Sequence, residues 1–162
     1  MNSLYTQYDV PQDLQFQTSD IVRMGGLICS AQIAPKNLIG VLETPNKITK
    51  VVVKLSFSVA SQEILVQGEI SGERSIQCAR CLTQTVQSFC ETFLETYSTK
   101  REIIDIMSLV KQTLALTEEI RFLCKEDCKG LCAQCGQNLN EGPCNCKTEN
   151  LSPFAVLKGK FK

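Results

Sequence analysis

The most informative absence in this sequence is histidine, which occurs at none of its 162 positions. Without an imidazole there is no Ser-His or Cys-His catalytic pair, no histidine general base and no zinc site of the mixed Cys/His type. Any metal ligands must therefore be thiolates or carboxylates.

The sequence also lacks a pattern of paired carboxylates that would indicate a general acid and a general base in a cleft. Adjacent acids occur at Glu118 and Glu119 and at Glu126 and Asp127, and we expect these side chains to be simply solvated. The sequence therefore offers no general acid or base, and we expect a protein that is not an enzyme and has no small-molecule substrate.

Tryptophan is missing, aromatic residues make up only 6%, and long apolar runs are lacking. The longest uncharged stretches, such as residues 24–35, fall short of the roughly 18 apolar residues that cross a membrane. The first twenty residues carry Asp9, Asp13 and Asp20 and lack the basic and then apolar pattern of a secretory signal. We therefore expect a cytoplasmic protein with no membrane contact.

Strand-like alternation dominates the chain between Ile21 and Ser98. In KVVVKLSFSVA, every second residue is apolar from Val51 to Val59, which is typical of a half-buried strand. The run EILVQGEISGERSIQC follows after a short Ser61-Gln62 connection and predicts an antiparallel hairpin. Its two glycines, Gly68 and Gly72, indicate a bulge or bend.

Near residue 105 the apolar period changes to about 3.6, which predicts one amphipathic helix at 105–116 with Asp105 as its N-cap. We expect this helix to cover the sheet. The predicted fold class is α+β, with closure of the antiparallel sheet into a barrel left open. The expected organisation is an irregular segment at 1–20, an antiparallel β domain at 21–100, the helix region at 101–120, and a cysteine-rich zinc module with a basic tail at 121–162.

Cysteine is abundant, with ten residues in a chain expected to stay in a reducing compartment, where metal binding is favoured over disulfides. Cys29 and Cys90 occur singly in strand patterns, and we expect them to be small buried core residues. The other eight occur in pairs.

The strongest local motif is CAQCGQNLNEGPCNC. Its C-x2-C knuckle, Cys132 and Cys135, lets both sulfurs reach one tetrahedral zinc at about 2.3 Å, and the following Gly136 tolerates a positive φ. Cys144 and Cys146 supply a second pair. Together they predict a four-thiolate zinc site.

A second predicted site joins Cys78 and Cys81 of CARC to Cys124 and Cys128 of CKEDC, and would pin the module to the sheet. The spacing also permits the CKEDC pair to join the C-x2-C knuckle, so the sequence does not decide how the eight cysteines divide between two sites. Two zinc ions per chain are expected, in closed shells that are structural rather than catalytic.

The cysteines permit three other interpretations. A thioredoxin-type redox pair at CARC should open a helix, whereas its flanks have strand patterns. CKGLCAQC has the C-x3-C-x2-C spacing of radical enzymes that use S-adenosylmethionine, but only 27 residues follow it, too few for their barrel. A simple iron-sulfur carrier stays open, since thiolates also hold iron.

Four motifs in order carry a resemblance to a known family: CARCL at 78–82, CKEDCKGLCAQCGQNLNE at 124–141, the Cys144/Cys146 pair and SPFAVL at 152–157. They resemble the YceD-like large ribosomal RNA subunit accumulation proteins of bacteria and plastids, from about Ser71 to the C-terminus. The resemblance implies a factor needed for accumulation of 23S ribosomal RNA, and so for biogenesis of the large ribosomal subunit.

The charge balance bears on the partner. The 17 Lys and Arg residues equal the 17 Asp and Glu residues, and two four-thiolate zinc sites would lower the net charge to about −4. RNA binding normally needs a basic patch, and the one local candidate is the lysine-rich stretch from Lys147 to Lys162, which also carries Phe154 and Phe161. We therefore expect the partner to be a ribosomal protein or a large-subunit precursor, with contact to 23S rRNA local and secondary. The alternative is a zinc-stapled protein-interaction module without a ribosomal role.

Overall fold

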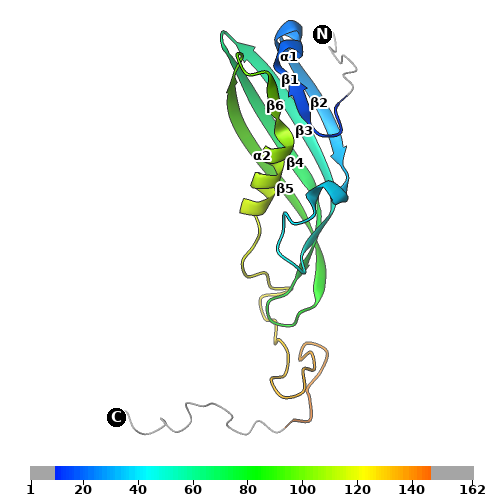
Figure 1. Ribbon diagram of the computed structural model, residues 1–162. Helices are drawn as coiled ribbons and strands as arrows, with labels where there is room; N and C mark the ends of the chain where they lie inside the picture. The colour runs from blue at the N-terminus through cyan, green and yellow to red at the C-terminus, as the bar shows by residue number, and fades with distance from the viewer. Residues whose placement is uncertain (1–9, 147–162) are drawn as a thin grey trace, which may run out of the picture.

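The computed structural model describes residues 10–146 as a curved antiparallel sheet that holds two helices, with a cysteine-rich extension beyond one end (Figure 1). The elements in chain order are β1 (Gln15–Gln17), α1 (Thr18–Met24), β2 (Gly26–Ile33), the 3-10 turn η1 (Pro35–Leu38), β3 (Lys47–Ala60), β4 (Glu63–Gln77), β5 (Gln84–Ser98), β6 (Ile103–Asp105) and α2 (Ile106–Leu116).

The predicted hairpin is confirmed as β3 and β4, which pair antiparallel from Ala60 and Glu63 outward around the Ser61-Gln62 turn. Val51 and Val53 are fully buried on the core face, as the alternation predicts. The main sheet has the order β2-β3-β4-β5 and all its pairs are antiparallel. Within residues 10–146 it does not close into a barrel, because β2 and β5 are edges.

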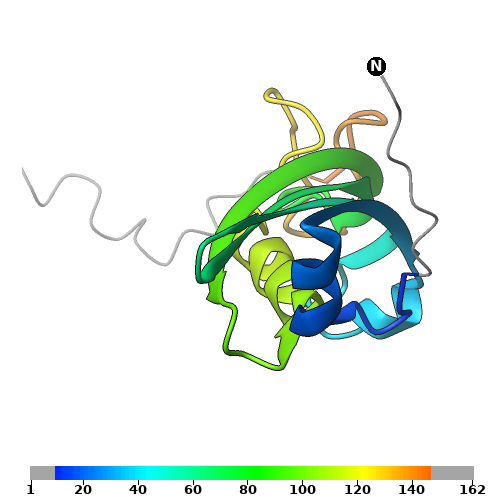
Figure 2. The same cartoon turned by 90° about the horizontal axis from the view of Figure 1, so that it is seen from above.

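The covering helix is also confirmed. The Asp105 carboxylate accepts the backbone N–H of Ser108 at 3.2 Å, and Ile106, Val110 and Leu114 are buried. Figure 2 shows the sheet curving around α2, which lies on its concave side together with α1. In the part of the chain described, no helix is long and apolar enough to cross a membrane.

The expectation of an irregular segment at 1–20 is wrong for residues 15–20, whereas residues 10–14 form no helix or strand. β1 pairs with β6 in a second, two-stranded sheet, and Phe16 is fully buried with its ring centroid 4.8 Å from that of Phe57. α1 follows directly and buries Ile21. A strand of three residues and a helix of seven are too short to show a period in the sequence. Residues 1–9 lie outside the described part.

The two glycines of β4 do not mark a bulge, since the register irregularity lies in the facing part of β3. Gly68 pairs with Phe93, whose ring occupies the space that a Cβ on Gly68 would need. Gly72 pairs with Phe89, and a Cβ on Gly72 would meet the Lys50 carbonyl oxygen first and the Phe89 ring at 3.0 Å. The glycines therefore seat two aromatic rings of β5 on the core face of the sheet.

We expect Gly72→Ala to destabilise the protein by about 1 to 3 kcal/mol, because the new Cβ would overlap the backbone carbonyl oxygen of Lys50, which belongs to a paired strand and cannot move aside. Denaturant unfolding measures this. Gly142→Ala is the matched control, since its Cβ meets no atom within 4 Å. Equal stabilities for the two variants would show that the β3–β4 contact is looser than described.

Candidate metal centres

The eight paired cysteines gather beyond one end of the sheet, at the bottom of Figure 1. Cys78 and Cys81 lie on the turn between β4 and β5, and Cys124 and Cys128 lie in the segment after α2. Although 50 residues separate Cys78 from Cys128, their sulfurs are 3.8 Å apart, and those of Cys81 and Cys124 are 3.6 Å apart.

These distances fit one tetrahedral metal ion. Four sulfurs at about 2.3 Å from a shared ion lie about 3.8 Å from each other. All four sulfurs of this first group are within 4.8 Å of one another, and Cys78 and Cys128 are 0% and 3% exposed. The donor set is therefore compact, thiol-only and largely shielded from water.

The second group contains Cys132, Cys135, Cys144 and Cys146, whose sulfurs also lie within 4.8 Å of one another. It is more exposed than the first group. The structure thus brings the eight thiols together in the two sets that the sequence predicted, and does not join the CKEDC pair to the C-x2-C knuckle. Their role as metal ligands stays a prediction.

The two C-x2-C knuckles form the same backbone turn. In each, the N–H of the first cysteine donates to the carbonyl five residues on, and the N–H four residues on donates back to that cysteine. The bonds are Cys78 N to Thr83 O, 3.0 Å, and Leu82 N to Cys78 O, 3.0 Å, matched by Cys132 N to Gln137 O, 2.8 Å, and Gly136 N to Cys132 O, 2.9 Å. Gly136 has the expected positive φ of 73°, and Leu82 holds the equivalent position at 58° despite its side chain.

Polar groups donate hydrogen bonds to the sulfurs of the first group. The backbone N–H of Arg80 lies 3.5 Å from Cys78 Sγ, and Asn140 Nδ2 lies 3.3 Å from Cys128 Sγ. Asn140 Oδ1 also accepts the backbone N–H of Lys129 at 2.9 Å, so this side chain braces the loop between the two groups. The sequence pattern marks Asn140 only as a turn residue, which conceals this role.

Within each group, hydrogen bonds and burial give the thiols different pKa values. Burial opposes ionisation of Cys78, but the backbone N–H groups around it outweigh that effect and lower its pKa to about 6, whereas burial raises the pKa of Cys124 to about 12. Backbone hydrogen bonds lower the pKa of Cys132 to about 6, and a hydrogen bond with Cys135 raises that of Cys146 to about 12. Thiolates so close together repel one another, so ionising all four requires a cation among them.

A buried arginine fastens the module to the sheet. Arg74, on the core face of β4 and 6% exposed, donates to the Thr117 carbonyl at 3.1 Å and to Gln87 Oε1 at 2.8 Å, and pairs with Glu119 at 3.4 Å. The chain leaving α2 is therefore held at a defined place before it reaches Cys124.

The expectation that Glu118 and Glu119 are simply solvated is wrong. Besides the Arg74 contact, Glu119 accepts from Gln87 at 3.0 Å, and Glu118 accepts from Asn46 Nδ2 at 2.8 Å. These partners are about 30 to 75 residues away along the chain, so no local pattern reports them. Glu126 and Asp127 are exposed, as expected.

Of the two predictions for the single cysteines, that for Cys29 is confirmed in part and that for Cys90 is wrong. Cys29 is partly buried against the core, and this burial raises the pKa of its thiol to about 11. Cys90 is exposed, because it lies on the outer face of an edge strand. Neither joins a metal-type group.

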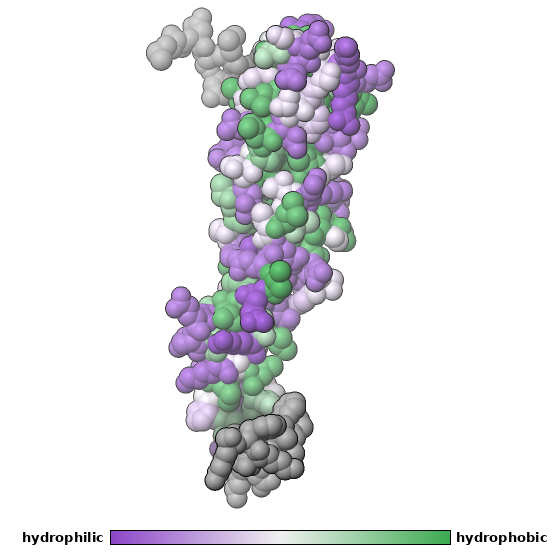
Figure 3. Space-filling view, turned by 90° about the vertical axis from the view of Figure 1, so that its left-hand side faces the viewer, coloured by the Kyte–Doolittle hydropathy of each residue, from purple (hydrophilic) through white to green (hydrophobic). Residues whose placement is uncertain are grey.

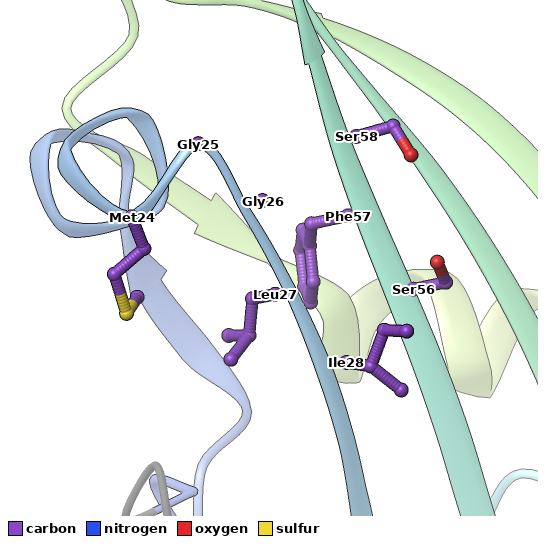
Figure 4. Close-up of a pocket in the computed structure, with 8 residues that line it drawn as sticks. All are labelled: Met24, Gly25, Gly26, Leu27, Ile28, Ser56, Phe57 and Ser58. Atoms are coloured by element: carbon purple, nitrogen blue, oxygen red, sulfur yellow. The ribbon is translucent and has the colours of Figure 1, made fainter. Parts of the chain in front are cut away.

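A surface pocket between α1, β2 and β3 offers no comparable chemistry (Figure 4). Its lining contains no titratable side chain and consists of Met24, Gly25, Gly26, Leu27, Ile28, Ser56, Phe57 and Ser58. The two cysteine groups are therefore the better candidates for a functional site.

Known proteins match the C-terminal part of the chain. Residues 97–160 match the family model described as Large ribosomal RNA subunit accumulation protein YceD. The protein named Large ribosomal RNA subunit accumulation protein YCED homolog 1, chloroplastic, from Zea mays is 40% identical over 60 residues, and its namesake from Arabidopsis thaliana is 39% identical over 63. Each alignment covers 36% of this chain and 20% of the relative, so the chain spans about a fifth of the length of these curated relatives.

No solved structure matches the chain. The SPFAVL motif and the lysine-rich stretch from Lys147 onward lie outside the described residues, so only the cysteine part of the predicted motif set has a structure here. The resemblance that the cysteine motifs indicated is nevertheless confirmed, since residues 97–160 match the model of the YceD family of large ribosomal RNA subunit accumulation proteins and the two relatives carry that name.

Proposed function

We propose that this chain is a non-enzymatic, zinc-stabilised factor that supports accumulation of 23S ribosomal RNA and thereby biogenesis of the large ribosomal subunit. The observation that carries this proposal is the overlap of the family match with the metal-type groups. The matched residues 97–160 include six of the eight grouped cysteines: Cys124, Cys128, Cys132, Cys135, Cys144 and Cys146.

The sulfur geometry supports a single ion in each group. Thiolates bound to different irons of an iron-sulfur cluster lie farther apart than thiolates that share one ion. The close spacing, with sulfurs 3.6 Å and 3.8 Å apart in the first group, therefore favours a mononuclear site. Zinc suits four thiolates in a closed shell, where it supplies folding free energy instead of catalysis.

Charge supports a protein partner over naked RNA. Residues 117–146 contain three basic and five acidic residues, and two four-thiolate zinc sites would add a charge of about −4. Such a module repels phosphate, so we propose that the chain binds a ribosomal protein or an assembly intermediate and meets 23S rRNA only locally. The relatives' names place them in chloroplasts, and a cytoplasmic location stays a prediction for this chain.

Metal analysis of protein purified without added metal should give about two zinc ions per chain. One zinc per chain would contradict one of the two four-thiolate sites, and the single substitutions below identify which one. Iron in place of zinc would overturn the structural role proposed here.

Single substitutions should separate the two sites. Cys128→Ser should remove one zinc and lower the melting temperature by roughly 10 °C, because this site joins the module to the sheet. Cys144→Ser should remove the other zinc with a smaller effect on melting of the sheet. Cys90→Ser is the control, since Cys90 is exposed and belongs to neither group, and should retain both ions.

The ribosomal role is tested in cells. Depletion of the protein should lower 23S relative to 16S rRNA, and the protein should co-sediment with precursors of the large subunit. A double Cys124→Ser, Cys128→Ser variant should lose co-sedimentation. Absence of the wild-type protein from every ribosomal fraction would favour the alternative, an interaction module without a ribosomal role. Tight binding to protein-free 23S fragments with a steep salt dependence would contradict the protein partner.

A further inference from the structure

The strand β5 is a long sheet edge that is open along one side. All 15 of its residues pair with β4, and within residues 10–146 no strand pairs with its other side. It forms the left-hand edge of the sheet in Figure 1. Edge strands are usually protected by proline, charged side chains, a bulge or a covering element, because their free N–H and C=O groups invite another strand. β5 contains no proline, lysine or arginine and pairs without a register shift. Its only charges are Glu91 and Glu95, which oppose an acidic strand but not a basic one.

The side chains of β5 are less covered than those of its neighbour. No residue of β5 is buried, whereas β4 buries most of the residues on its core face. On the core side of β5, Phe89, Phe93 and Tyr97 pack against the core but remain partly exposed. Figure 3, which shows the left-hand side of Figure 1, presents this side as hydrophobic patches interspersed with hydrophilic ones. A further strand along β5 would cover the open flank of these rings.

Acidic residues alternate with the aromatic ones on the same side of β5. Since every second residue faces the same way, Glu91 lies between Phe89 and Phe93, and Glu95 lies between Phe93 and Tyr97. Neither glutamate forms an ion pair among residues 10–146. The core side of the edge is thus a row of alternating ring and carboxylate.

Cations already pack at both ends of this row. The guanidinium carbon of Arg74 lies 5.8 Å from the centroid of Phe89, and that of Arg101 lies 5.5 Å from the centroid of Tyr97. Between these two arginines, the row from Glu91 to Glu95 has the chemistry to accept further basic side chains.

We propose that the open edge of β5 binds an extended, basic segment of a protein as a fifth strand of the sheet. Main-chain hydrogen bonds would supply the docking, as in other cases of strand addition. Specificity would come from lysine or arginine opposite Glu91 and Glu95 and an apolar side chain opposite Phe93, since directly opposed residues on paired strands interact. This deepens the proposed function, on which it rests for its biological setting, by naming the chemistry of the protein partner.

The charges of Glu91 and Glu95 favour a basic peptide at the β5 edge over two other binding partners. A nucleic acid would bring phosphates against Glu91 and Glu95, which repel them. A second copy of this chain would bring the same two glutamates, so that the shared edge would hold four carboxylates. A basic peptide is complementary at both positions.

The test uses the full-length, zinc-loaded chain and a fluorescent nine-residue peptide, Val-Thr-Lys-Thr-Val-Thr-Lys-Thr-Val. Its lysines fall opposite Glu91 and Glu95 when it pairs antiparallel with β5. We expect saturable binding by anisotropy, about tenfold weaker binding of the peptide with both lysines replaced by glutamate, and no binding when the threonines on either side of the central valine become proline. Failure of the lysine peptide to bind, or its equal binding with glutamate or proline, overturns the proposal.

A charge-reversal variant makes the test specific to the edge. Glu91→Lys with Glu95→Lys should weaken the lysine peptide about tenfold and strengthen the glutamate peptide. The control is Glu63→Lys with Glu73→Lys, the same change of net charge on the outer face of β4, which should alter affinity by less than about twofold. Equal effects of the two double variants would show that net charge is responsible and overturn the proposal, as would a β5-mediated dimer seen by sedimentation.

This binding measurement contains no ribosomal component. It can therefore fail while co-sedimentation and the dependence of 23S rRNA on the protein still hold, and it can succeed if they do not. The two failures are distinguishable.

Discussion

The thiol group shared between the β4–β5 turn and the segment after α2 is the contact on which the arrangement of the molecule depends. Among residues 117–146 there is no regular helix or strand, only a single bridge between Leu131 and Asn138. A segment with so few backbone bonds and so little apolar surface does not offset the entropy of its own ordering. Its shape therefore depends on the sheet, through the four thiols and the buried Arg74. The zinc proposed for these thiols would make folding and metal binding one event.

The two knuckles show how the sheet contributes to that shape. Leu82 adopts a left-handed backbone that a leucine tolerates poorly, yet it occurs in the turn of a hairpin whose strands pair over 15 residues. The surrounding pairing determines the turn and outweighs the local strain. Gly136 forms the same turn in a loop with no flanking sheet, and there the residue is a glycine that adopts this conformation without cost.

The first thiol group and the open edge are adjacent along the chain. β5 begins three residues after Cys81, so the first thiol group holds the start of the strand while β4 holds its length. Gly68 and Gly72 of β4 seat the rings of Phe93 and Phe89 that line the core side of that edge. The row of β5 is therefore held along its whole length before a partner binds, and such pre-organisation would reduce the entropy cost of binding a partner strand.

Several elements could be predicted because their patterns are local. The alternation from Val51 to Val59 defined a strand face, and Asp105 marked the start of α2 by its ability to cap. The sequence failed where long-range packing decides. β1 and α1 are too short for periodicity, and Cys90 follows the strand pattern of a core residue but lies on an edge with an open outer face.

By itself the sequence determined the chemistry of the candidate centres: eight paired thiols, no histidine, and a glycine where the C-x2-C turn requires positive φ. Only the tertiary structure decided which thiols share a group and which carboxylates form hydrogen bonds and ion pairs. The spacing of Cys124 and Cys128 allowed them to group either with Cys78 and Cys81 or with Cys132 and Cys135, and nothing near Glu119 in the sequence predicted its ion pair with Arg74. Both contacts depend on how the β4–β5 hairpin meets the chain leaving α2. Contacts between residues more than forty positions apart depend on how the elements pack, and the local sequence pattern carries no information about that packing.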